Sequence, residues 1–145
     1  MDTKTPILNV NEVTKTFPGV VALDKVSFDI RPGEVHALVG ENGAGKSTTL
    51  KAVSGLLKTE DGEVTKGTIH FKGESIGNRA PDDIVRRGIF QVMEGRRIIE
   101  DMTVIENLRL GAYTRPARSS KADMAKVSHY SPRPRERPAM PVGNS

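Results

Sequence analysis

The feature that most constrains this chain is a glycine-rich loop, Gly40–Ser47, with the pattern Gly, four residues, Gly-Lys-Ser. It directly follows the segment Glu34–Val39, which is typical of a strand, and it precedes the segment Leu50–Leu57, whose apolar residues have helical spacing. A strand, a glycine loop and a helix in this order form the context in which such a loop binds phosphate groups. The pattern predicts an α/β fold with a phosphate-binding loop (P-loop), a helix that begins at Lys46, and Gly55 as the end signal of that helix.

The fixed positions of the loop each have a physical reason. Gly43 and Gly45 can adopt backbone angles closed to other residues, so that successive N–H groups point at an anion. Lys46 is expected to place its ammonium between the outer phosphates, and the Ser47 hydroxyl to ligate the Mg²⁺ that bridges them. The positive end of the helix dipole adds to the attraction. The expected nucleotide contacts in the loop are Gly40, Glu41, Asn42, Gly43, Ala44, Gly45, Lys46, Ser47 and Thr48.

Composition excludes several other classes of protein. The 145 residues suffice for one domain, and the absence of cysteine excludes disulfides and thiolate metal sites. No apolar run approaches the roughly 20 residues that span a bilayer, and the start of the chain lacks the pattern of a signal peptide. We therefore expect a cytoplasmic protein with no transmembrane segment. From Tyr113 onward seven Lys or Arg residues face two acidic ones, which we interpret as a solvated basic tail and not as a nucleic-acid site.

Periodicity and turn residues place the other elements. Pro81 at a first helical position, acidic residues after it and Gly88 as a stop predict one short helix, and Thr103 with Glu106 forms a capping box for another. The remaining expected elements are strands at Ile7–Val10 and Val26–Ile30 with a turn at Phe17–Val20, a strand at Thr68–Phe71, and a buried strand at Gly88–Val92.

The composition changes near Arg115 to Pro, Arg, Ser and Lys. Because such a segment buries too little apolar surface to offset its chain entropy, we expect disorder there. The predicted division is an ordered domain at residues 1–114 and a disordered, basic, proline-rich tail at residues 115–145. A proline-rich ligand for a recognition domain is the alternative interpretation of this tail.

Two segments resemble a known family. Gly33–Leu50 closely resembles the P-loop region of ABC-transporter ATPases, and Thr14–Phe28 looks like the opening β subdomain of the same family. Downstream, Gly88–Arg97 and Leu108–Arg115 resemble the ATPases of importers for branched-chain amino acids. The flanks of the P-loop also resemble sugar-importer ATPases, and the amino-acid importers are the favoured match. The resemblance covers about residues 6–115.

The resemblance implies further site residues. An aromatic residue at the position of Phe17 stacks on adenine in the family, and a core Phe beside a turn is the alternative. Glu94, within Glu-Gly-Arg, matches the position of the family's Q-loop glutamine and is the expected contact to metal or water, with a solvated loop carboxylate as the alternative. Met93 stands where the family commonly has a proline. Gln91 falls three residues early and is not assigned to the site.

The resemblance also implies an activity and partners. It implies ATP and Mg²⁺ as ligands and ATP hydrolysis coupled to transport. The partners implied are a second ATPase subunit and a membrane permease, which would hold the protein on the inner face of the plasma membrane.

Several parts of the family's catalytic site have no match in this sequence. No acidic pair follows an apolar strand after the P-loop, and no serine-glycine signature is recognisable. No histidine matches the switch position, because His36 lies inside a predicted strand and His129 in the tail. We expect an ABC-type P-loop NTPase fold truncated before the signature motif, which binds ATP without turnover by itself. Truncation or a change of reading frame is the hypothesis for the tail. The alternatives are a non-catalytic nucleotide-binding or interaction module, an unstable fold whose P-loop strand lacks parallel neighbours, and a nucleic-acid binder that uses the tail.

Overall fold

The computed structural model describes residues 5–60, 62–95 and 98–130. The chain divides into two compact units, Met1–Gln91 and Val92–Ser145, which are described separately. This boundary lies before Val92, whereas the sequence placed a division after residue 114.

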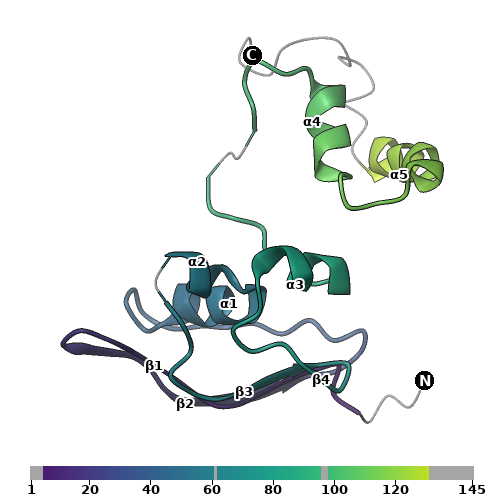
Figure 1. Cartoon of the computed structure of the whole chain (residues 1–145). Helices are drawn as coiled ribbons and strands as arrows, with labels where there is room; N and C mark the ends of the chain where they lie inside the picture. Colours follow the sequence, from purple (N-terminus) through teal and green to yellow (C-terminus); the bar gives the residue numbers. More distant parts are fainter. Residues whose placement is uncertain (1–4, 61, 96–97, 131–145) are drawn as a thin grey trace. The chain divides into compact units, whose positions relative to one another are not determined.

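The first unit contains a four-stranded sheet. Its order is β2-β1-β3-β4, and each neighbouring pair is antiparallel. The strands are β1 (Leu8–Phe17), β2 (Val20–Ile30), β3 (Lys66–Phe71) and β4 (Glu74–Ser75) (Figure 1). The predicted turn at Pro18 and Gly19 joins β1 to β2, and Gly19 has the positive φ of 80° that a tight turn requires. Both predicted N-terminal strands therefore exist, and each is longer than expected.

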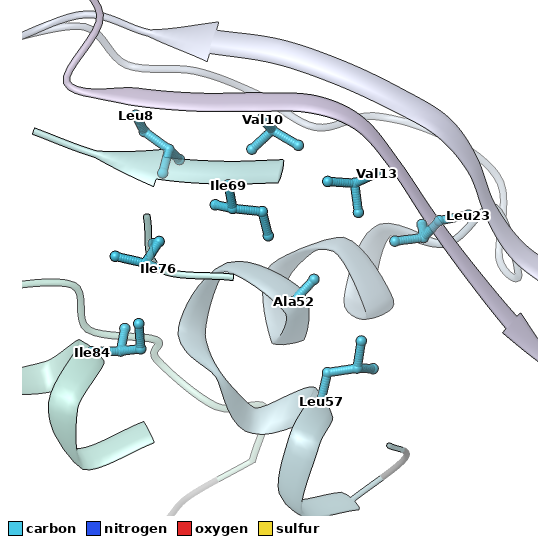
Figure 2. Close-up of a cluster of buried hydrophobic side chains, with 9 residues drawn as sticks. All are labelled: Leu8, Val10, Val13, Leu23, Ala52, Leu57, Ile69, Ile76 and Ile84. Atoms are coloured by element: carbon cyan, nitrogen blue, oxygen red, sulfur yellow. The ribbon is translucent and has the colours of Figure 1, made fainter. Parts of the chain in front are cut away.

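Three helices cover one face of this sheet: α1 (Lys46–Ser54), α2 (Leu56–Glu60) and α3 (Pro81–Arg87) (Figure 1). Between sheet and helices lies a cluster of buried apolar side chains, which Figure 2 shows pointing toward one another from both layers. Burial of such side chains is the main favourable term in folding. The members of the cluster are Leu8, Val10, Val13, Leu23, Ala52, Leu57, Ile69, Ile76 and Ile84.

The helix boundaries follow the predicted local signals. Gly55 ends α1 in the left-handed conformation with φ of 78°, and a Cβ there would lie 2.7 Å from the carbonyl oxygen of Arg79. Pro81 begins α3, and Gly88 ends it with φ of 102° while its N–H donates to the carbonyl oxygens of the last turn. These start and stop signals act within a few residues, which is why the sequence alone reveals them.

Two predicted strands are absent from the part of the chain that the structure describes. Residues 34–39 and 88–92 contain no strand, and several of their apolar side chains are open to solvent: Val35 is 98% exposed, Phe90 63% and Val92 95%. Ile89 is half-buried against the core cluster. A strand forms only when a neighbouring strand accepts its backbone hydrogen bonds. Among the described residues β1–β4 pair with one another. These two segments therefore have the composition of strands but no partner strand within the described residues.

The second unit contains α4 (Val104–Gly111) and α5 (Ala117–Tyr130). The predicted capping box is confirmed: the Glu106 N–H donates to Thr103 Oγ1 at 3.3 Å, and the Thr103 N–H donates to Glu106 Oε2 at 2.8 Å. Helix α5 lies where the sequence predicted disorder, and that prediction is wrong for this stretch. Prolines begin again only at Pro132, and α5 contains three Ala and two Lys, which favour helix.

An ion pair adds a tertiary contact to this stretch. Arg115 Nε lies 3.1 Å from Asp123 Oδ2, between the connection and the helix. Residues 131–145, and with them the proposed proline-rich ligand, lie outside the described residues. None of the helices in the described ranges is both long enough and apolar enough to cross a bilayer.

Candidate nucleotide-binding site

The P-loop leads from the exposed segment 34–39 into the first turn of α1. Gly43 and Gly45 have φ of 88° and 80°, as predicted from the motif, and the Ala44 N–H donates to the carbonyl oxygen of Glu41 at 3.1 Å to close the turn. Residues 40–44 are all exposed. The loop therefore presents its backbone to solvent at the N-terminus of a helix, where the unpaired N–H groups and the helix dipole favour an anion.

Lys46 folds back over this loop. Its ammonium donates to the carbonyl oxygen of Glu41 at 2.7 Å and also to the carbonyl oxygen of Gly40. The two carbonyls keep the charge above the loop backbone, which is where the outer phosphates of a nucleotide are expected. A phosphate oxygen would take over as the acceptor for this ammonium.

The first turn of α1 is fixed by Thr49, which the prediction did not include. Its N–H and its hydroxyl both donate to the Gly45 carbonyl oxygen, at 2.8 and 2.9 Å, and the side chain is buried. Ser47, in contrast, is exposed, and Thr48 is half-buried. A threonine whose hydroxyl donates to the carbonyl oxygen four residues earlier is a known local pattern. The position of Thr49, four residues after Gly45, was therefore the signal in the sequence that could have predicted this contact.

Gly45 also connects the loop to the sheet. A Cβ at this position would lie 2.5 Å from the carbonyl oxygen of Ala22 and 2.8 Å from Leu23 Cδ2, so β2 passes directly against the loop. In the sheet Leu23 is paired with Lys15, and Val20 with Phe17. The P-loop therefore packs on the hairpin whose end carries the predicted adenine contact, which the sequence motif could not show.

Phe17 has features of both an adenine-stacking residue and a core residue beside a turn. Its ring is half-buried and packs against the core cluster, as a core Phe would. Part of the ring remains accessible at the end of β1, and the Lys15 ammonium lies over the ring, 4.7 Å from its centre. Stacking on adenine stays a prediction.

The two residues discussed as Q-loop candidates have different surroundings. Gln91 is half-buried, and its side-chain oxygen accepts a hydrogen bond of 2.6 Å from Ser54 Oγ at the end of α1. Glu94 is exposed and belongs to the second unit. The structure thus gives Gln91 a packing role, and the assignment of Glu94 to metal or water stays a prediction.

The connection that precedes the P-loop carries its own small network. Glu34 accepts hydrogen bonds from the Arg31 N–H at 2.8 Å and from the His36 ring at 3.1 Å, and these bonds, the backbone one first, lower the pKa of its carboxyl. The His36 ring also stacks on Phe28, with 5.6 Å between ring centres. His36 therefore contributes a hydrogen bond to Glu34 and a stacking contact with Phe28 in this connection.

Magnesium has one protein ligand in the P-loop prediction, Ser47. Over the described ranges no group of three or more His, Cys, Asp or Glu side chains is placed to hold a metal ion. Mg²⁺ is commonly bound by one or two protein oxygens together with substrate phosphates and water. The exposed Ser47 hydroxyl fits an ion that arrives with the nucleotide.

The fold and the loop agree with comparisons to known proteins. The chain is 43% identical over 117 residues to a ribose import ATP-binding protein of Streptomyces coelicolor, covering 79% of this chain and 22% of the relative. It is 42% identical over 105 residues to a putative ribose/galactose/methyl galactoside import ATP-binding protein of Rhizobium etli, covering 72% of this chain and 19% of the relative. These names agree with the sugar-importer resemblance and do not support the preference for branched-chain amino acid importers.

Solved structures give the same picture. A nucleotide-free ATP-binding cassette from an ABC transporter matches with a TM-score of 0.67 and 30% identity, over 80% of this chain and 45% of that one. The ADP conformation of an ATP-binding cassette matches with the same TM-score and 29% identity, over 81% and 45%. This chain therefore spans about a fifth of the sugar-import relatives and less than half of the solved cassettes. It has the mixed α/β fold of part of an ABC nucleotide-binding domain.

The family model described as ABC transporter matches residues 23–139, well past residue 115, where the recognised resemblance ends. The match includes the P-loop, α1 and both helices of the second unit. This chain belongs to the ABC transporter family.

Proposed function

We propose that this chain binds Mg²⁺-ATP through residues 40–48 as part of the ATPase subunit of an ABC importer. The observation that carries the proposal is the geometry of the P-loop. Its two glycines adopt positive φ, its backbone is exposed at the start of α1, and the Lys46 ammonium is held over it by two carbonyl oxygens. The loop backbone and Lys46 would bind the phosphates, and Ser47 would ligate the metal ion.

We further propose a sugar of the ribose and galactose type as the imported solute, because the relatives quoted above carry that name. Import of branched-chain amino acids is the alternative, and it rests on the resemblance around Glu94. Uptake of labelled ribose and labelled leucine by cells with and without the gene for this chain separates the two. Loss of leucine uptake alone would overturn the sugar assignment.

Membership in an importer ATPase also implies partners. We propose a second ATPase subunit and a membrane permease, with the protein on the cytoplasmic side of the membrane. ATP hydrolysis coupled to transport would be an activity of that assembly. ATP binding without turnover by the chain alone is the alternative.

The first experiment is calorimetry of ATP binding, with and without Mg²⁺, on the full chain and on Lys46→Ala. We expect binding by the wild type and a loss of at least about tenfold in Lys46→Ala, because a charge-assisted bond to phosphate contributes about 1.5–3 kcal/mol. Lys51→Ala, on the same helix but outside the motif, is the matched control. Equal affinities of Lys46→Ala and the wild type would contradict the proposed site.

A phosphate-release assay on the same samples addresses the alternative function. A non-catalytic nucleotide-binding module would bind ATP and release no phosphate, with or without added membranes containing the permease. Release that depends on the permease and on Lys46 would instead support the transport ATPase.

A further inference from the structure

Lys15 is a charged residue at a core-facing position of β1. From Val13 onward the strand buries alternate residues, so Val13 and Lys15 point to the same face as the half-buried Phe17. Lys15 is only 5% exposed. Lysine is almost never buried to this extent without partners, because removing an ammonium from water is costly. The contacts of this side chain therefore call for an explanation beyond packing.

The Lys15 ammonium contacts both the segment before β3 and the Phe17 ring. It donates a hydrogen bond of 3.0 Å to the Glu63 carbonyl oxygen, and it lies over the Phe17 ring at 4.7 Å from the centre. It also lies tightly against the turn before β3, since a Cβ on Gly62 would come within 3.2 Å of the nitrogen. The ammonium is thus enclosed between a turn and one face of an aromatic ring.

The turn that carries the acceptor is itself tied to β1. The Thr65 N–H donates to the Thr14 carbonyl oxygen at 2.9 Å, and the Thr16 N–H donates to Thr65 Oγ1 at 3.3 Å. These bonds flank Lys15 on both sides. They keep the Glu63 carbonyl at a fixed place relative to the end of β1, and so they fix the cation and the ring together.

The same residue is one step away from the P-loop. Lys15 pairs with Leu23 across the β1–β2 ladder, and Leu23 packs against Gly45. The Phe17 ring, the cation over it and the start of the phosphate-binding helix are therefore parts of one packed unit. A contact that fixes the orientation of the Phe17 ring therefore also fixes its position relative to the proposed phosphate site.

We propose that Lys15 is a positioning residue for the nucleotide base, because it holds the Phe17 ring by a cation–π contact on one face and leaves the opposite face for adenine. This inference rests on the proposed function, in which Phe17 stacks on the base. A cation attracts the ring face electrostatically and so sets its orientation, whereas an apolar side chain of similar length would only fill the space. A preset ring lowers the ordering cost of binding.

The test compares ATP with tripolyphosphate, which carries the phosphates without the base, by calorimetry on the full chain. Lys15→Met removes the charge and keeps the length, and Lys15→Arg keeps a cation that can lie over the ring. We expect Lys15→Met to bind ATP about 5- to 30-fold more weakly, the range that a loss of about 1–2 kcal/mol gives. Tripolyphosphate affinity should stay unchanged, and Lys15→Arg should recover ATP affinity.

A double-mutant cycle with Phe17→Leu locates the effect. If Lys15 acts through the ring, Lys15→Met in the Phe17→Leu background should cause no further loss of ATP affinity. Lys15→Gln, which keeps a donor for the Glu63 carbonyl without a cation, is the second uncharged variant and should weaken ATP binding as Lys15→Met does. It decides the question if thermal unfolding shows that Lys15→Met does not fold.

Three results would overturn the proposal. Equal losses of ATP and tripolyphosphate affinity would make Lys15 a general structural residue. Full ATP affinity in both uncharged variants, or additive losses in the cycle, would remove its link to the ring. Failure of the proposed function is seen separately: wild-type chain that binds neither ligand has no P-loop site, and normal ATP affinity in Phe17→Leu means that the base does not stack there.

Discussion

Replacing Gly45 with alanine tests the contact that joins the P-loop to the sheet. The new Cβ would stand 2.5 Å from the Ala22 carbonyl oxygen and 2.8 Å from Leu23 Cδ2, closer than non-bonded atoms approach. The residue also has φ of 80°, which side chains of L-amino acids rarely adopt. The substitution therefore combines backbone strain with overpacking against β2.

The two costs can be separated. Holding a non-glycine residue at such a φ costs about 1–3 kcal/mol, and inserting an extra methyl group into a packed contact costs about 1–3 kcal/mol more. Gly43 has φ of 88° and no atom within 4 Å of an added Cβ, so Gly43→Ala carries only the first cost. We expect Gly45→Ala to be less stable than Gly43→Ala by about 1–3 kcal/mol.

Thermal unfolding followed by circular dichroism on the full chain measures this difference. For a unit of this size each 1 kcal/mol lowers the midpoint by about 4–8 °C, so the two variants should differ by at least about 4 °C. Gly19→Ala, at φ of 80° with open space around it, is a second control outside the P-loop. If Gly45→Ala and Gly43→Ala unfold at the same temperature, the loop does not pack on β2 as described.

Two further predictions concern the first unit. Ile84 is fully buried, so Ile84→Ala should lower the free energy of unfolding by about 2–5 kcal/mol in urea titrations, whereas Leu50→Ala, at a side chain that is 51% exposed, should change it by less than about 1 kcal/mol. The pKa of Asp83 is lowered, first because Arg79 donates a hydrogen bond of 3.0 Å to its carboxylate. Its stabilising contribution is therefore present above the unfolded-state pKa of about 3.9 and is lost as the pH falls through the folded-state pKa. Urea titrations between pH 5 and about 2.5 should show that the free energy of unfolding declines less steeply in Asp83→Asn than in the wild type. Asp82→Asn is the control for charge on the same helix turn. An equal decline in Asp83→Asn and the wild type would contradict this prediction.

The elements that the sequence predicted correctly depend on neighbours within a few residues. Gly55 and Gly88 end their helices because only glycine takes a left-handed angle at little cost, and Thr103 caps α4 through a bond to a residue three positions away. The P-loop glycines belong to the same class. The strands at residues 34–39 and 88–92 were predicted from the same kind of local pattern, and there it was wrong.

The sequence by itself determined the glycine-rich loop, the helix that follows it, and the ABC transporter family, because each of these depends on a contiguous stretch of residues. The tertiary structure decided which extended segments become strands, since a strand needs hydrogen-bond partners that are remote in sequence. It also decided that Gly45 lies against Ala22 and that Lys15 is buried beside Phe17. A lysine in a strand is normally expected to face solvent, whereas here its ammonium donates a hydrogen bond to the Glu63 carbonyl oxygen, 48 positions away along the chain.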